Sequence, residues 1–407
     1  MSRQFTISIL LLLSTVPAAA QVSPPAPQTT VDASRGGITI SSGVNSLTIG
    51  ARMQFRWTLD DREDSSTDTT GSGVGQDDGP VSAFDVPRMR VSFSGGMFRP
   101  WLKYQFQFDF SRTSGESSSK IKDAVIEIRP TGRAYSVAFG QFKAPFGLQQ
   151  LTSSGRLEFV DRAITDSKFT PSREMGGMVS ATLAGRKVGM AGGLFNGSGE
   201  SVRQNNQSLL VAGRVYVQPL GPYALSEGSS DAPTTHVLHL GFGARTGEQI
   251  RGRTAAGIVE QADNQTALNA EFAYKRSRLF TTAEYFWMTD EQRNPVEGRD
   301  IDSRGFHAQG GYMIVPRRLE VGLLVSRITP DTDVDDAELS ELRGVVGYYW
   351  QGHGLKLQGD VGQLEFGENF SALPARARQG LPSLGARLSS GQSFRDLQAR
   401  VQLQIAF

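Results

Sequence analysis

The sequence contains no cysteine and, beyond its first residues, no long run of apolar residues. Without cysteine there is no disulfide framework, no thiolate metal site and no cysteine nucleophile. A helix that spans a membrane needs about 18 consecutive apolar residues, and the sequence after the N-terminal region offers none. Transmembrane β-barrels escape this test, because alternate residues of each strand build their lipid face.

An excess of charge of one sign is also lacking, since 42 Lys and Arg residues stand against 41 Asp and Glu residues. This balance predicts no nucleic-acid partner. The 4 histidines show no metal-ligand spacing, and no Ser and His pair marks a hydrolase. We therefore predict no enzymatic activity and no cofactor.

The N-terminus reads "MSRQFTISILLLLSTVPAAAQ", with a basic residue, a short apolar run and three alanines. This pattern predicts a secretory signal peptide over residues 1–20, so the mature chain is exported. Loss of Arg3 with this peptide leaves 41 basic residues (42 − 1) against 41 acidic ones. The Pro-rich residues 21–46 are expected to form a flexible segment.

The stretch "LTIGARMQFRWTLD", residues 47–60, alternates apolar and polar residues with a period of two. Such a period predicts a strand with one apolar and one polar face. In a soluble sheet the apolar face would pack on a core. In a transmembrane barrel it would meet lipid, and Arg52 and Arg56 would point into an aqueous lumen.

About sixteen segments of this kind follow one another, and their connections decide between the two alternatives. Long links alternate with short ones such as "PTGR", "AGRK" and "VPRR", and only 219–234 is a long member of the short set. The predicted strands are 47–60, 84–94, 101–110, 121–129, 134–140, 175–183, 187–196, 209–218, 235–245, 266–275, 279–289, 304–314, 319–329, 341–350, 354–365 and 394–407.

The last segment, "LQARVQLQIAF", ends with Phe407 on its apolar face, as bacterial outer-membrane barrels end. We therefore predict that residues 47–407 form an all-β fold, a transmembrane antiparallel β-barrel of about sixteen strands. Short turns would lie on the periplasmic side and long loops outside, with outer-membrane lipid and lipopolysaccharide around the barrel. Sixteen strands leave a lumen wide enough for solutes.

The strand parity places more basic than acidic side chains on the lumen face. An excess of guanidinium groups attracts anions, and Arg presents a fork of donors that matches phosphate or carboxylate oxygens. Alternatively, the arginines pair with luminal carboxylates and only fill space. The basic set is Arg52, Arg56, Arg88, Arg90, Lys103, Arg129, Arg214, Arg245, Lys275, Arg343, Lys356 and Arg400, and the acidic set is Asp109, Asp123, Glu127, Glu271, Glu284, Glu320 and Asp360.

The long link 141–174 carries apolar residues that would be costly to expose on an extracellular surface. Folding into the barrel would bury them and constrict the pore. Ser153, Ser154 and Arg156 could then offer hydroxyl and guanidinium donors to a passing anion. The alternative is a surface loop with a short helix near 156–163.

The segments "GQFKAPFGLQQLTSSGRLEFVDRA", "PSREMGGMVSA" and "AGGLFNG" resemble the phosphate-selective porin O and P family. The resemblance implies a trimer, an inward third loop and an arginine ladder that leads anions to a constriction. Thr152 to Ser154 match the constriction serines of that family. Phosphate-specific members have a lysine shortly before them, where this sequence has Gln149 and Gln150.

We therefore predict an outer-membrane porin for passive diffusion of anions, with phosphate or polyphosphate as candidate solutes. Two alternatives stay open from the sequence. One is a general, weakly selective small-solute porin. The other is a structural or adhesive barrel that transports nothing, although residues 21–46 are too few to form an occluding plug.

Overall fold

The structure, a computed structural model, describes residues 28–34, 36–63, 80–111, 120–202, 208–253, 259–292, 299–382 and 391–407. The predicted signal peptide 1–20 lies outside these residues. No helix within them is long and apolar enough to cross a membrane.

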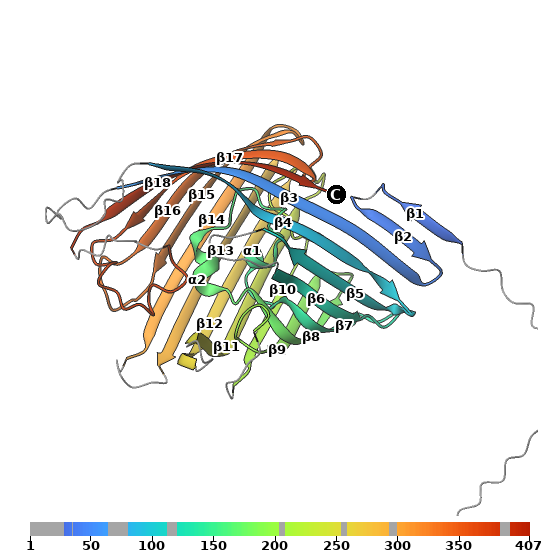
Figure 1. The fold of residues 1–407 in the computed structure, drawn as a ribbon, viewed down its shortest axis with the longest axis horizontal. Helices are drawn as coiled ribbons and strands as arrows, with labels where there is room; N and C mark the ends of the chain where they lie inside the picture. The colour runs from blue at the N-terminus through green and yellow to red at the C-terminus, as the bar shows by residue number, and fades with distance from the viewer. Residues whose placement is uncertain are drawn as a thin grey trace, which may run out of the picture.

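The described residues form eighteen strands and two short helices (Figure 1). In chain order they are β1 (Thr29–Asp32), β2 (Ile38–Ser42), β3 (Asn45–Arg62), β4 (Val81–Met97), β5 (Arg99–Asp109), β6 (Lys120–Ile128), β7 (Tyr135–Lys143), α1 (Leu148–Leu151), α2 (Ile164–Phe169), β8 (Arg173–Leu183), β9 (Val188–Phe195), β10 (Leu210–Val217), β11 (Val237–Arg253), β12 (Val259–Arg276), β13 (Leu279–Gln292), β14 (Ile301–Val315), β15 (Leu319–Thr329), β16 (Leu339–Tyr349), β17 (Leu355–Phe366) and β18 (Phe394–Ala406).

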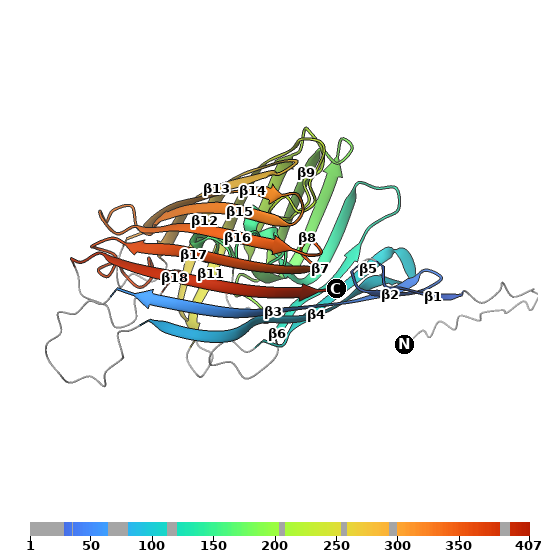
Figure 2. The ribbon, with the colours of Figure 1, turned by 90° about the horizontal axis from the view of Figure 1, so that it is seen from above.

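The sixteen strands from β3 to β18 form a closed antiparallel barrel, which confirms the predicted fold. Each strand pairs with the next along the chain, and β18 pairs with β3 from Asp396↔Arg62 to Ala406↔Arg52. The two ribbon views show the resulting wall around the inner segments (Figures 1 and 2). Closure leaves no unpaired strand edge in hydrocarbon.

The two faces of the wall differ as the alternation in the sequence predicts. Met53 and Phe55 are 42% and 43% exposed, whereas Gln54 between them is 0% exposed. At the other side of the seam, Gln404 is 1% exposed and Phe407 is 55% exposed. The apolar face is therefore the outer surface, and the polar side chains point inward.

The N-terminal region differs from the expectation of a flexible segment over 21–46. β1 pairs antiparallel with β2 from Thr29↔Ser42 to Asp32↔Thr39, and β2 pairs with β3 from Ile38↔Ile49 to Ser42↔Asn45. β18 pairs with β3 only from Arg52 onward, and β2 pairs with the same edge of β3 before that residue. The β-branched residues Ile38 and Ile40 at alternate positions of "ITISS", and Val31 in "TTVD", favour these strands.

Two further strands extend beyond their predicted ends. β11 and β12 pair as far as Arg253↔Val259, whereas the sequence predicts that they end near 245 and begin near 266. The sequence of this part does not alternate between apolar and polar residues, so it carries no strand signal although the backbone ladder continues.

Candidate functional site: a basic cleft beside an inward segment

The segment 144–172, which links β7 to β8 and contains α1 and α2, lies inside the barrel (Figure 1). It contacts strands on several sides of the lumen. Glu284 on β13 accepts hydrogen bonds from the backbone N–H groups of Leu148 at 2.6 Å and Gln149 at 2.8 Å. On β17, Lys356 Nζ donates to the carbonyl oxygen of Leu157 at 2.7 Å.

Apolar contacts hold the same segment in place. The rings of Phe169 and Phe286 stack with centroids 5.1 Å apart, and Phe146 packs beside them. Leu157 and Phe159 are 0% and 1% exposed. Burial of these side chains favours the inward position by about 1.5–3 kcal/mol for each residue.

The turn 218–236, between β10 and β11, enters the lumen from the opposite mouth. Glu227 is 2% exposed and accepts hydrogen bonds from Gln149 Nε2 at 3.1 Å and from the backbone N–H of Glu158 at 2.9 Å. Tyr223 packs against Leu148. This contact between the turn and the inward segment was not predicted, although the unusual length of 219–234 was its signal.

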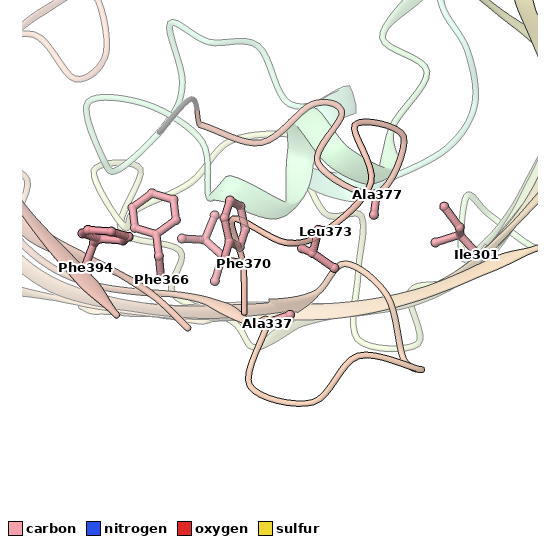
Figure 3. Packing of buried hydrophobic residues seen from close by; sticks show 8 residues of the cluster. Ile301, Ala337, Phe366, Phe370, Leu373, Ala377 and Phe394 are labelled. Carbon is pink, nitrogen blue, oxygen red and sulfur yellow. The ribbon is translucent and has the colours of Figure 1, made fainter. Parts of the chain in front are cut away.

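The loop between β17 and β18, described over residues 367–382 and 391–393, also folds against the inner wall. Phe370, Leu373 and Ala377 from this loop pack on strand residues, among them Phe366 and Phe394 (Figure 3). The loop reaches α2, because Lys168 Nζ donates to the carbonyl oxygen of Ala377 at 2.7 Å. These segments fill the lumen beside β13 to β18.

An open cleft of about 440 Å³ remains between the inward segment and the wall on the side of β4 to β8. Its lining contains six basic and two acidic side chains. They are Arg88, Arg90, Lys122, Lys143, Arg162 and Arg173 against Asp123 and Glu200. Ser153 and Ser154 line the loop side.

Ion pairs occupy most of the arginines at the cleft. Asp161 on the inward segment lies 2.7 Å from Arg88 Nη2 and 3.1 Å from Arg56 Nη1. Burial raises the pKa of the Asp161 carboxyl, but these two guanidinium groups outweigh it and hold the pKa well below its usual range. Arg90 Nε donates to Asp109 Oδ2 at 2.7 Å. Asp161 therefore stays ionised and ties the loop to the wall.

The remaining predicted site residues lie away from the cleft lining. Arg214 pairs with Glu271 at 2.6 Å, and Arg400 pairs with Asp360 at 2.7 Å. Lys103 is half-buried on β5, and Arg156 is exposed on the inward segment. Neither forms an ion pair within 4.0 Å among the residues that the structure describes.

Arg52 lies beside the cleft and contacts its loop side. Its Nη1 donates to Ser153 Oγ at 3.1 Å, and its Nη2 donates to Ser154 Oγ at 3.0 Å. The expected hydroxyl donors are therefore acceptors toward this arginine.

Four basic residues of the cleft were not among the predicted site residues. Lys122 has the parity of the lipid face, but a register shift between Gln107 and Phe108 turns its side chain toward the cleft. Lys143 and Arg173 form a cross-strand pair at the ends of β7 and β8, inside the range expected to be loop. Longer predicted strands β7 and β8 would have included Lys143 and Arg173, whereas the sequence gives no signal for the register shift beside Lys122.

Together the closed barrel, the inward segment and the polar cleft define a porin, a channel protein of the bacterial outer membrane. A family model described as phosphate-selective porin O and P matches residues 49–351. The chain belongs to this family, and it resides in the outer membrane.

Solved structures show the same fold at low sequence identity. An anion-selective porin from Comamonas acidovorans is 12% identical with a TM-score of 0.58, and the match covers 89% of this chain and 100% of that chain. The outer-membrane protein OmpT of Vibrio cholerae, in its trimer form, is 10% identical with a TM-score of 0.54, covering 89% and 99%. The outer-membrane channel DcaP of Acinetobacter baumannii is 11% identical with a TM-score of 0.54, covering 89% and 97%. A search of curated protein sequences finds no match.

Proposed function

We propose that this porin passes small anions, phosphate among them, through the cleft between the inward segment and the strands β4 to β8. The observation that carries the proposal is the lining of six basic and two acidic side chains. A passage with this charge balance concentrates anions and depletes cations. Diffusion is passive, and no chemical step accompanies it.

The family supports the same solute class, since its description is phosphate-selective, and the Comamonas porin is described as anion-selective. Selectivity is expected to be moderate, because carboxylates pair with Arg88, Arg90 and Arg173. Each pair leaves a smaller field for a passing anion than a free guanidinium would. We further propose a homotrimer, since the similar structure of OmpT from Vibrio cholerae is described as a trimer form.

Single-channel recording in a planar bilayer tests the proposal. The purified porin is placed in a salt gradient, and the sign of the reversal potential reports which ion passes faster. We expect anion-selective current that added phosphate reduces. Cation selectivity would refute the proposal, and anion selectivity without reduction by phosphate would indicate a general anion porin.

Current through the wild-type channel also distinguishes transport from a purely structural barrel. A folded protein that inserts in the bilayer and carries no current would refute any porin function. Heat-dependent mobility of the oligomer on a gel, a property of closed barrels, would show that the inactive protein is folded.

A further inference from the structure

Arg52 and Arg90 are direct neighbours across the pair β3 and β4, where the register places them opposite each other. Arg90 has a carboxylate partner in Asp109. Arg52 has none within 4.0 Å among the residues that the structure describes, and its Nε lacks any hydrogen-bond partner there. The two adjacent guanidinium groups therefore carry two positive charges, and one carboxylate, that of Asp109, pairs with them.

Both guanidinium groups converge on one hydroxyl. Arg52 Nη2 lies 3.0 Å from Ser154 Oγ, and Arg90 Nη1 lies 3.3 Å from the same atom. A serine oxygen has two acceptor positions, and these two donors fill both. Ser154 can then only donate its hydrogen, so its oxygen occupies the place where an anionic oxygen would satisfy two arginines.

The chain holds the backbone around Ser154 firmly in this place, while the hydroxyl can still rotate. A Cβ atom at Gly155 would lie 2.2 Å from Arg52 Nη1, so only glycine lets the backbone approach the guanidinium this closely. Lys143 Nζ donates to the carbonyl oxygens of Gln150 at 2.5 Å and Thr152 at 3.0 Å. These contacts fix the backbone just before the serines.

We propose that the Ser154 hydroxyl competes with passing anions for Arg52 and Arg90 and so keeps anion affinity low enough for release. The inference rests on the proposed function and specifies the ligand chemistry, an oxyanion with two or more oxygens. A hydrogen bond to an anionic oxygen is roughly twice as strong as one to a neutral oxygen. The anion therefore displaces the hydroxyl, and the hydroxyl returns when the anion leaves. Fast conduction needs this kind of weak, reversible binding.

The variant Ser154→Ala tests the proposal, because competition and donation predict opposite changes. If the hydroxyl competes, its removal frees one donor on each arginine, and the phosphate concentration that halves the chloride current falls about five- to tenfold. The residence time of each blocking event lengthens by a similar factor. If the hydroxyl instead donates to the anion, the half-blocking concentration rises.

Three further variants make the test specific. Ser153→Ala frees one donor of Arg52 only, so its effect is in the same direction and smaller. Ser154→Thr keeps a hydroxyl and is expected to stay close to wild type. Ser180→Ala is the matched control, because this hydroxyl pairs with Ser136 at 2.9 Å, away from both arginines.

Arg52→Gln combined with Ser154→Ala completes the test. The gain in phosphate affinity that Ser154→Ala brings is expected to be smaller in the Arg52→Gln background than in the wild type, since only the donor of Arg90 is then freed. An unchanged or raised half-blocking concentration in Ser154→Ala, with anion-selective current intact, overturns the inference alone. Cation-selective or absent current in the wild-type porin overturns the proposed function instead.

Discussion

Replacement of the Asp161 carboxylate is the most direct test of how charge in the cleft sets anion preference. This carboxylate pairs with Arg88 and Arg56 on the wall while it belongs to the inward segment. The variant Asp161→Asn keeps the shape of the side chain and removes one negative charge. We expect the anion preference of the channel to rise, because Arg88 lines the cleft and loses its neutralising partner.

The size of this change follows from Coulomb's law. A unit charge at about 5 Å from a passing anion in a water-filled passage contributes about 0.8 kcal/mol. Removal of the negative charge therefore raises anion partitioning about fourfold. Salt screens this interaction over about 10 Å at 0.1 M and about 3 Å at 1 M. The increase is thus expected at low salt and should nearly vanish at high salt.

Reversal potentials of the wild type and the variant, measured at both salt concentrations, check this expectation. Asp335→Asn is the matched control, since it removes the same charge from an exposed position between β15 and β16. Equal selectivity of Asp161→Asn and wild type at 0.1 M salt would show that anions do not pass near Arg88.

Three other perturbations follow from the same geometry. Replacement of both Arg88 and Arg90 by Gln should lower anion preference, and unchanged reversal potentials would remove the two arginines from the pathway. Deletion of 150–165 should raise single-channel conductance, because the segment fills part of the lumen; equal conductance would place it outside the passage. Burial together with two neighbouring carboxylates raises the pKa of Glu158 well above its usual value. Since the folded pKa lies above the unfolded value of about 4.3, the stability that protonation provides is complete below that pH and is lost as pH rises through the folded pKa. Calorimetry should therefore show that Glu158→Gln stabilises the porin more at pH ~8 than at pH ~5, and an equal effect at both would contradict this assignment.

The sequence predicts the wall of this barrel well because a strand between lipid and water has a strict period of two. β15 is predicted at 319–329 and observed at Leu319–Thr329. The period holds only where the two faces meet different solvents. Towards Arg253↔Val259, β11 and β12 continue as a ladder that no alternation in the sequence marks, and β1 is too short to show one.

The interior was harder to predict, because it depends on which distant side chains meet. Arg214 and Arg400 have the expected lumen parity, but only the fold brings Glu271 and Asp360 to them. The role of Ser154 likewise depends on two arginines more than sixty residues away in the sequence. Spacing along a strand identifies the face of a residue, and it carries no information about the partner across the lumen.

The seam between β18 and β3 makes the barrel a structure of very high contact order. Gln54 on β3 and Gln404 on β18 are hydrogen-bonded across 350 residues of chain, and Arg56 meets Gln402 across 346. Contacts this distant form late and slowly, because nearly the whole chain must be ordered before they can exist. Until the last strand docks, both β3 and β17 have an open edge that lipid cannot satisfy. A chain that ends before residue 394 would therefore lack the strand that covers the edges of β3 and β17, and its barrel could not close.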